Sequence, residues 1–203
     1  MTKIKICGLM RQEDILAVNA ARPDYVGFVF AKGRRRTILH DTAAMLRSRL
    51  DDGIKAVGVF LNNEIKEIEK ICRDGIIDIV QLHGDEDEAY IRNLKERTDC
   101  PLIRAVSVRC REDILRAAEL PVDFLLLDTY KQGQIGGTGE TFDWQMIPPL
   151  PLPYFLAGGI NEDNIRTAMQ YGAYALDVSS GAETEGKKDP VKIMNLVRKV
   201  RGE

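Results

Sequence analysis

The chain has 203 residues, of which 44% are hydrophobic and 30% charged, a composition typical of a soluble globular protein. Lys and Arg number 29 against 31 Asp and Glu, and the resulting net charge of -2 argues against nucleic acid or an anionic membrane as the main partner. No apolar stretch approaches the ~18 residues that span a bilayer, and Lys3 and Lys5 interrupt the apolar run of a secretory signal, so we expect a cytoplasmic protein.

Apolar runs of strand length alternate with helical stretches, and many of these runs are rich in Val, Ile and Phe, as buried parallel strands are. Eight strands are predicted, at residues 3–7, 24–30, 54–60, 77–81, 102–106, 122–128, 154–157 and 173–178.

Helix signals occur between the predicted strands. Asp85 and Glu88 form a capping-box pattern ahead of a helix over 89–97, and Asn161 is expected to open a helix that runs to 172. Asp189 followed by a proline is typical of an N-cap, and further helices are predicted after Asn63 and over 111–119. The segment 129–153 is expected to be irregular, with one turn near Trp144.

Eight strand–helix units in 203 residues give 203/8, roughly 25 residues per unit, which suits a compact βα repeat. We therefore predict a (β/α)8 TIM barrel of the α/β class rather than a doubly wound open sheet, which usually has fewer strands. No composition shift or linker divides the chain, so residues 1–203 are expected to form a single domain.

A barrel of this kind places its active site where the C-terminal ends of the strands meet. Cys7 ends the first predicted strand ahead of Gly8, although a free cysteine is more often a small buried hydrophobe. The other three cysteines, Cys72, Cys100 and Cys110, show no C-x-x-C spacing and carry no comparable signal.

Asp128 closes an apolar run, so it either caps the next loop or serves as an acid whose pKa burial raises.

Small residues follow the last two predicted strands. Gly158 and Gly159 precede a predicted helix, and Ser180 and Gly181 follow the eighth strand. Converging backbone N–H groups at such loops bind phosphate, and barrels often place phosphate there. The alternative is that these glycines only form turns.

Three further groups belong to the predicted rim. Gly136, Gly137 and Gly139 lie in a glycine-rich loop that is a flexible linker, a Walker-like loop without its lysine, or a lid over the substrate. His83 is one of two histidines, with a surface position as the alternative to a ligand contact. The arginine run 34–36 is either a solvated loop or a site for a carboxylate.

Taken together, these motifs resemble the phosphoribosylanthranilate isomerase family of tryptophan biosynthesis, a family of single-domain barrels. The resemblance spans the chain in order and is carried by the segments 5–8 (KICG), 81–84 (QLHG), 136–144 (GGTGETFDW), 156–161 (LAGGIN) and 177–181 (DVSSG) with Glu183.

The resemblance implies an isomerase that converts N-(5-phosphoribosyl)anthranilate to 1-(2-carboxyphenylamino)-1-deoxyribulose 5-phosphate by an Amadori rearrangement, without metal or cofactor. It gives Cys7 the role of general base and Asp128 that of general acid. Substrate contacts are expected from His83 and Asp177, and phosphate contacts from the loops after the last two strands. The expected partner is this small molecule, and the enzyme is expected to be a monomer or homodimer.

The resemblance also places the anthranilate carboxylate on an arginine in the loop after the second strand. Arg36 holds that register, but the family's usual Ser-Pro-Arg or Ser-Lys-Arg appears here as three consecutive arginines, so Arg35 is an alternative. A further hypothesis pairs Lys5 with Asp177 inside the barrel, since an inward lysine is otherwise costly.

Rival interpretations remain at this stage. Indole-glycerol-phosphate synthase would need a catalytic lysine at a strand end, and a pentose-phosphate epimerase would need paired aspartates with metal-binding histidines. A catalytically silent phosphate or flavin-nucleotide binding barrel is the alternative outside enzymes, and the presence of both Cys7 and Asp128 argues against it.

Overall fold

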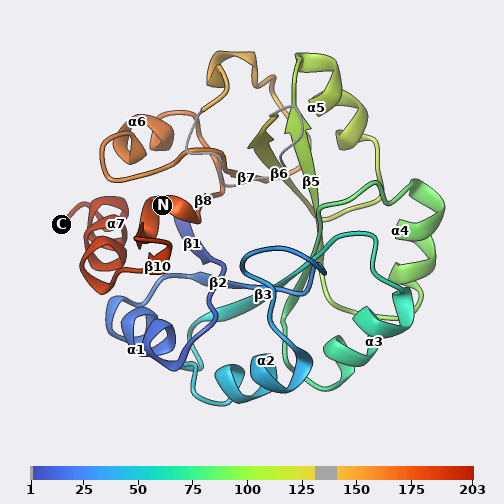
Figure 1. Ribbon diagram of the computed structural model, residues 1–203. Coiled ribbons are helices and arrows are strands. Elements are labelled where there is room, and N and C mark those ends of the chain that lie inside the picture. Colours follow the sequence, from blue (N-terminus) through green and yellow to red (C-terminus); the bar gives the residue numbers. More distant parts are fainter. Residues whose placement is uncertain (1, 131–140) are drawn as a thin grey trace.

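Eight parallel strands form a closed barrel in sequence order, with β8 pairing back to β1 (Figure 1). The computed structural model describes residues 2–130 and 141–203. The predicted barrel is therefore confirmed. The strands are β1 (Lys3–Cys7), β2 (Tyr25–Val29), β3 (Lys55–Phe60), β4 (Ile79–Leu82), β5 (Leu102–Val108), β6 (Phe124–Thr129), β7 (Tyr154–Leu156) and β8 (Ala175–Val178).

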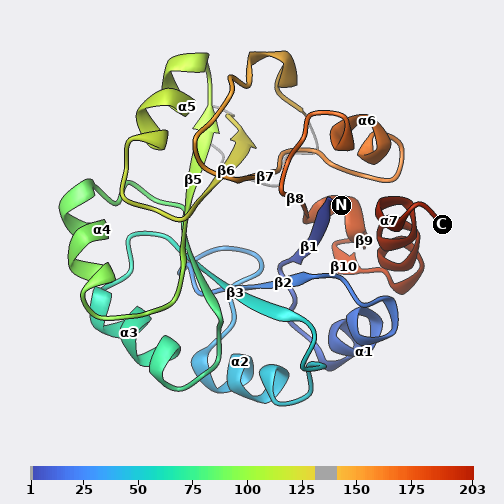
Figure 2. The ribbon, with the colours of Figure 1, turned by 180° about the vertical axis from the view of Figure 1, so that it is seen from behind.

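Helices surround the barrel on its outside, as the views from opposite ends show (Figures 1 and 2). They are α1 (Gln12–Ala21), α2 (His40–Arg47), α3 (Ile65–Arg73), α4 (Glu88–Lys95), α5 (Arg111–Ala118), α6 (Ile165–Met169) and α7 (Pro190–Arg201), with short 3-10 turns η1 (Trp144–Met146) and η2 (Ser180–Ala182). The last helix, α7, packs between α1 and α6 and so closes the ring of helices.

Alternation along each strand separates two apolar layers. In β1, Ile4 and Ile6 point outward and join the large core between strands and helices, as the sequence pattern predicts. The residues between them point inward. A smaller cluster fills the barrel interior below the site; it consists of Tyr25, Val57, Ile79, Ile103, Ala105, Leu126, Phe155, Ala157 and Ala175. The barrel interior is thus a packed core, with Lys5, Gln81 and Asp177 gathered above it. At the other end, Lys3 donates a hydrogen bond to the hydroxyl group of Tyr174.

The seam between β1 and β8 sets the register of the site. Lys5 is the pairing partner of Asp177, so both side chains lie on the inner face at the same height. Their ammonium and carboxylate groups are 3.0 Å apart, which confirms the predicted ion pair. The strand ends above this pair therefore meet at one mouth.

Several predicted boundaries are wrong. Helix α4 is capped by Asp87, whose carboxylate accepts the backbone N–H of Tyr90, and not by Asp85. Asn161 opens a turn in which its side chain accepts the N–H of Asp163, so α6 starts only at Ile165.

The structure also contains a short hairpin, β9 (Glu183–Thr184) and β10 (Lys187–Lys188), between η2 and α7. The helix capped by Asp189 with Pro190 at its start is present as predicted, and so is the turn at Trp144. Among the described residues, no helix is long and apolar enough to cross a membrane.

Candidate active site

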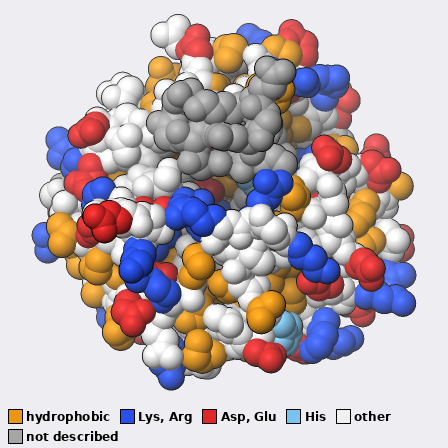
Figure 3. Space-filling view, viewed as in Figure 1, with side chains coloured by type: hydrophobic (Ala, Val, Ile, Leu, Met, Phe, Trp, Pro, Cys, Tyr) orange, Lys and Arg blue, Asp and Glu red, His pale blue; other side chains and the backbone are white. Residues whose placement is uncertain are grey.

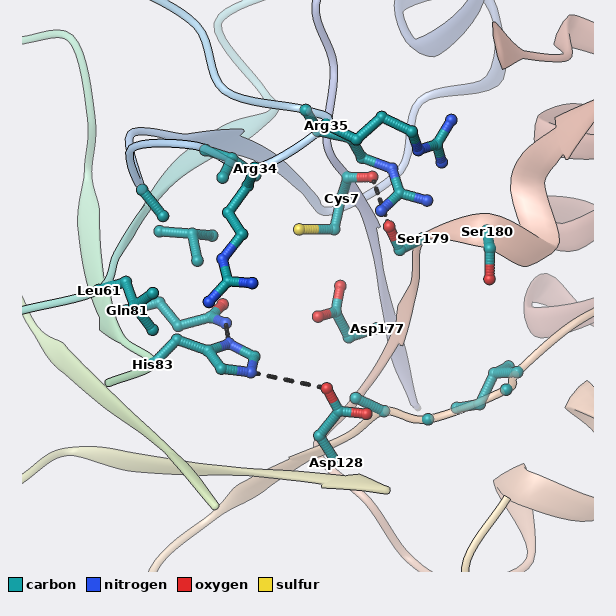
Figure 4. Close-up of a pocket in the computed structure, with 18 residues that line it drawn as sticks. Cys7, Arg34, Arg35, Leu61, Gln81, His83, Asp128, Asp177, Ser179 and Ser180 are labelled. Atoms are coloured by element: carbon teal, nitrogen blue, oxygen red, sulfur yellow. Dashed lines mark hydrogen bonds and ion pairs between the residues drawn. The ribbon is translucent and has the colours of Figure 1, made fainter. Parts of the chain in front are cut away.

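A cavity of about 470 Å³ opens at the C-terminal ends of the strands. Its polar lining includes Cys7, Gln81, His83, Asp128 and Asp177. In Figure 3, Lys and Arg side chains border a hollow near the centre of the face that carries these strand ends. Figure 4 shows that the side chains of Cys7 and Asp128 point into the same space from opposite walls. The two titratable groups expected from the sequence thus share one cavity.

Cys7 ends β1 and is only 8% exposed. Gly27 on the neighbouring strand makes room for it, because a Cβ atom there would lie 2.6 Å from the Cys7 sulfur. Burial raises the pKa of the Cys7 thiol above its ordinary value, although the ammonium of Lys5 acts in the opposite direction. Cys7 is therefore a thiol at rest, with a cation placed to stabilise its thiolate.

Lys5 is fully buried and uses all three of its donors on neighbouring groups. Its Nζ donates to Gln81 Oε1 at 2.7 Å, to Asp177 Oδ2 at 3.0 Å and to Cys7 Sγ at 3.5 Å. Burial alone would lower the pKa of Lys5, but the charge of Asp177 raises it above the ordinary value. Lys5 therefore stays protonated at the centre of the site.

Asp128 lies near the end of β6 and is 6% exposed. Burial raises the pKa of Asp128 to about 6, while the N–H of Thr129, which its Oδ1 accepts at 2.8 Å, limits the rise. A carboxyl group with this pKa is partly protonated near neutral pH and can act as an acid. The contact with Thr129 is the loop-capping role considered from the sequence.

His83 follows β4 and faces Asp128 across the cavity, with its Nε2 3.6 Å from Asp128 Oδ2 (Figure 4). Its side chain is 16% exposed, so it is not the surface histidine that the sequence left as the alternative. Gln81 Nε2 lies 2.9 Å from His83 Nδ1. Burial, reinforced by the charges of Lys5, Arg104 and Arg34, lowers the pKa of His83 to about 4, so the ring is neutral at physiological pH.

The two loops predicted to bind phosphate lie side by side at the mouth. Gly158, Gly159 and Ser180 line the cavity, and within the described part of the chain their backbone N–H groups donate no hydrogen bond. Gly181 does not line the cavity. It lets the two loops approach, since a Cβ atom there would meet the Ile160 carbonyl oxygen. Free amides at this position form the kind of site that binds an anion.

The arginine loop contacts the hairpin after β8. Arg36 donates to both carboxylate oxygens of Glu183, at 2.7 and 3.1 Å, and Arg35 donates to one of them at 2.6 Å. Lys188 adds a third cation at 2.8 Å. Although burial would raise the pKa of Glu183, the bonds from Arg36 and Lys188 lower it to about 2. Arg36 nevertheless lines the cavity, and its Nη1 has no hydrogen-bond partner in the described part of the chain.

Arg34 is the arginine that reaches into the cavity, beside Gln81 and His83 (Figure 4). Within residues 2–130 and 141–203, its guanidinium has no hydrogen-bond or ion-pair partner. The sequence pattern predicts ligand contacts only from Arg35 and Arg36, because the motif alone does not show which arginine side chains bind Glu183.

Asp177 presents a free acceptor to the cavity. One oxygen binds Lys5, whereas Oδ1 is buried and has no hydrogen-bond partner among the described groups. A buried unpartnered oxygen is costly, and a ligand hydroxyl group would satisfy it.

The remaining predicted elements contribute no geometry. Gly136, Gly137 and Gly139, predicted to form a lid, lie outside the described residues. No group of three or more His, Cys, Asp or Glu among the described side chains is arranged to hold a metal ion.

Fold and site together define a (β/α)8 barrel in which a thiol and a carboxyl group face one cavity beside a rim of backbone amides without partners among the described residues. Residues 4–199 match the family model for N-(5'-phosphoribosyl)anthranilate (PRA) isomerase. The isomerase of that name from Endomicrobium trichonymphae is 50% identical over 202 residues, which covers 99% of each chain. The chain therefore belongs to the N-(5'-phosphoribosyl)anthranilate isomerase family.

Solved structures of this family have the same fold. The enzyme from Thermotoga maritima is 33% identical, with a TM-score of 0.86 over the whole of both chains. A phosphoribosyl anthranilate isomerase in complex with reduced 1-(o-carboxyphenylamino)-1-deoxyribulose 5-phosphate is 32% identical, with a TM-score of 0.84 over the whole of both chains. A further structure, of monomers generated from the dimeric Thermotoga maritima enzyme, has a TM-score of 0.83 at 32% identity and the same coverage.

Proposed function

We propose that this chain catalyses its family's reaction, the Amadori rearrangement of N-(5'-phosphoribosyl)anthranilate, with Asp128 as general acid and Cys7 as general base. The observation that carries the proposal is the placement of these two groups on opposite walls of one cavity, at the rim where free backbone amides gather. In this proposal residues 1–203 act as one domain, because a single barrel supplies every group.

The first step opens the ribose ring. Asp128 gives its proton to the ring oxygen, the bond between that oxygen and C1 breaks, and the lone pair of the anthranilate nitrogen forms a protonated Schiff base. The raised pKa of Asp128, about 6, supports this role because a tenth or so of the carboxyl groups still hold the proton at pH 7.

The second step removes the proton from C2. The Cys7 thiolate takes this proton, and the electron pair forms the C1–C2 double bond of an enolamine. A proton returned to C1 and one lost from the C2 hydroxyl group produce the ketone and leave acid and base as they began. The Lys5 ammonium, 3.5 Å from the sulfur, stabilises the thiolate during this step.

The active pair needs a thiolate and a carboxylic acid at the same time. Burial raises the pKa of the Cys7 thiol, whereas the pKa of Asp128 is about 6, so the resting enzyme mostly holds a thiol and a carboxylate. One proton moved from Cys7 to Asp128 produces the active pair with no change in net charge. Because the pKa of the thiol lies above that of Asp128, this transfer is uphill, and the Lys5 ammonium, which favours the thiolate, lowers its cost.

The substrate fits the cavity in one direction. Its phosphate would bind the amides of Gly158, Gly159 and Ser180, and Asp177 Oδ1 would accept a ribose hydroxyl group. On the opposite side Val29, Ala31, Val59 and Leu61 form an apolar wall for the aromatic ring. Arg36, with Arg34 beside the wall, would then hold the anthranilate carboxylate.

The test is a fluorescence assay of anthranilate-containing substrate on the wild type, Cys7→Ser and Asp128→Asn. Each variant should lose about 10²–10⁴-fold in kcat while retaining its fold by circular dichroism. Turnover at the wild-type rate in both variants would refute the assigned roles. His40→Gln, on the outer helix α2, is the matched control and should leave the rate unchanged.

We also propose that the enzyme works in the cytoplasm, as a monomer or a homodimer. The first part is the expectation stated from the sequence, and the dimeric Thermotoga maritima enzyme makes a homodimer the state to test first. Sedimentation equilibrium across a range of protein concentrations distinguishes the two states.

A further inference from the structure

The orientation of the Gln81 side chain is fixed by Lys5. Gln81 is 1% exposed, and its Oε1 lies 2.7 Å from Lys5 Nζ. An ammonium group donates hydrogen bonds and accepts none, so the amide atom that faces it has to be the oxygen. The amide nitrogen of Gln81 is therefore turned the other way.

This nitrogen then determines which proton His83 carries. Gln81 Nε2 lies 2.9 Å from His83 Nδ1, and an amide nitrogen can only donate. His83 Nδ1 must accept, so it carries no proton, and the single ring proton sits on Nε2. Nε2 is the atom that faces Asp128 Oδ2 at 3.6 Å.

A second proton on the ring is opposed from every side. With a proton on Nδ1, two hydrogen-bond donors, Gln81 Nε2 and His83 Nδ1, would face each other at 2.9 Å. Three cations also face His83: Lys5 from β1, Arg34 from the loop after β2, and Arg104 from β5. Asp128 is the only acidic group within ion-pair distance of the ring among the described residues, and at 3.6 Å its contact is long.

We propose that Gln81 is a positioning residue that transmits the orientation set by Lys5 to His83, and so presents a neutral Nε2–H donor, and not a cation, to the general acid Asp128. The proposal rests on the acid role of Asp128 given above. A chain of three residues, from β1 through β4 to the loop that follows it, thus controls one proton.

The chemistry of the acid explains why a neutral donor is useful. An imidazolium beside Asp128 would favour its carboxylate and remove the proton that the ring oxygen needs. A neutral N–H group at 3.6 Å leaves the acid form in place. Once Asp128 has given up its proton, the same N–H can shorten its contact and stabilise the new carboxylate.

The sequence makes the test direct, because the chain has only two histidines. In the His40→Gln variant, His83 is the only imidazole, and long-range ¹H–¹⁵N NMR of the ¹⁵N-labelled protein reads its tautomer without substrate. We expect a protonated Nε2 and an unprotonated Nδ1 at pH 7. A protonated Nδ1, whether in the other tautomer or in an imidazolium, would overturn the proposal.

Two substitutions test the transmission, both in the His40→Gln background. In Gln81→Glu, a carboxylate faces both Lys5 and Nδ1, so a proton should move to Nδ1 and the ring should become an imidazolium at higher pH than in the parent. Gln81→Met has a similar length but no donor, so both neutral tautomers should be populated. An unchanged His83 spectrum in both variants would contradict the proposal.

Kinetics then separate this proposal from the proposed function. Gln81→Glu should lower kcat by less than the ~10²–10⁴-fold expected for loss of the acid, and should shift the acid limb of the kcat profile. If Asp128→Asn retained full activity, the acid role of Asp128 would be refuted, whereas the His83 tautomer observed by NMR would be unaffected. If Asp128→Asn were inactive but Gln81→Glu had wild-type kinetics, the positioning role of Gln81 would fail alone.

Discussion

The ammonium nitrogen of Lys5 lies 3.5 Å from the sulfur of Cys7, and both side chains are buried. A cation at this distance favours the thiolate, and it does so strongly where water is excluded. Because burial by itself raises the pKa of Cys7, Lys5 determines how far that rise is offset.

Replacing Lys5 by methionine should therefore raise the pKa of the Cys7 thiol further. Thiolate formation can be followed by ultraviolet absorbance as the pH is increased, with Cys7→Ser subtracted to remove the other three cysteines. A titration of Cys7 that does not move would contradict the role of Lys5.

The Lys5→Met experiment needs a control for the loss of stability that the substitution itself causes. Lys5→Met leaves Asp177 buried without its counter-ion, which typically costs about 3–5 kcal/mol. A double variant, Lys5→Met with Asp177→Leu, removes both charges and should regain most of that stability in urea unfolding. Its Cys7 thiol should still titrate later than in the wild type.

Asp128→Asn should be inactive but more stable than the wild type at pH 7. The pKa of Asp128 is about 6 in the fold against an ordinary 3.8, so the unfolded chain ionises first as the pH rises. The folded state therefore loses stability between about pH 4 and 6, and the loss persists above that range. The two-unit difference corresponds to at most about 3 kcal/mol.

Urea unfolding of the wild type and Asp128→Asn at a series of pH values tests this expectation. The stability advantage of the variant should shrink as the pH falls from 7 towards 4. Asparagine keeps a side-chain oxygen that can accept the N–H of Thr129, so this hydrogen bond is expected in both the wild type and the variant. A variant less stable than the wild type at pH 7 would show that ionisation of the buried Asp128 does not destabilise the fold.

The three arginines should differ in their kinetic effects. Arg36→Ala should raise KM about 10–100-fold, the loss expected for a charge-assisted hydrogen bond. Arg34→Ala should raise KM without loss of stability, because its guanidinium has no partner in the described structure. Arg35→Ala is the control, since among the described residues its exposed side chain donates hydrogen bonds to Glu183 and the Gly186 carbonyl oxygen.

Steady-state kinetics and thermal unfolding of the three variants separate these roles. Arg36→Lys should not rescue KM, because lysine cannot reproduce the two-pronged contact with Glu183. If Arg35→Ala showed the largest KM change, the carboxylate would belong to Arg35, the alternative that the sequence left open.

Gly27→Ala should damage the site while preserving the barrel. The added methyl group would lie 2.6 Å from the Cys7 sulfur, so Cys7 would have to move from its contact with Lys5. Overpacking of this kind typically costs about 1–3 kcal/mol. Gly53→Ala is the control, since no atom lies within 4 Å of its added Cβ. Equal activity of both variants would show that the position of Cys7 tolerates displacement.

Much of the fold could be predicted because buried parallel strands leave a strong sequence signal. The eight apolar runs were located to within a few residues, and alternation placed Lys5 and Cys7 on the inner face of β1. Helix starts were less predictable. Asp85 has the spacing of a cap, but Glu86 next to it folds inward to bind Arg104 at 2.7 Å, so the helix begins after Asp87.

The site was predictable only in part. Cys7 and Asp128 stand out because polar side chains at the ends of apolar strands are unusual. Gln81 does not, since its importance depends on a lysine 76 residues away. The choice among the arginines likewise depends on Glu183, 147 residues beyond Arg36 in the sequence. Such relationships arise from the register of the closed barrel, which local patterns do not contain.

The ion pair across the seam also constrains how the chain can fold. Lys5 is synthesised 172 residues before Asp177, so most of the sheet exists before its counter-ion does. An incomplete barrel that closed early would bury an uncompensated ammonium group, which disfavours such premature collapse. Docking of β8 therefore completes the circle of strands and the electrostatic setting of the Cys7 sulfur in the same event, so the charge balance of the cavity exists only once the last strand of the barrel has arrived.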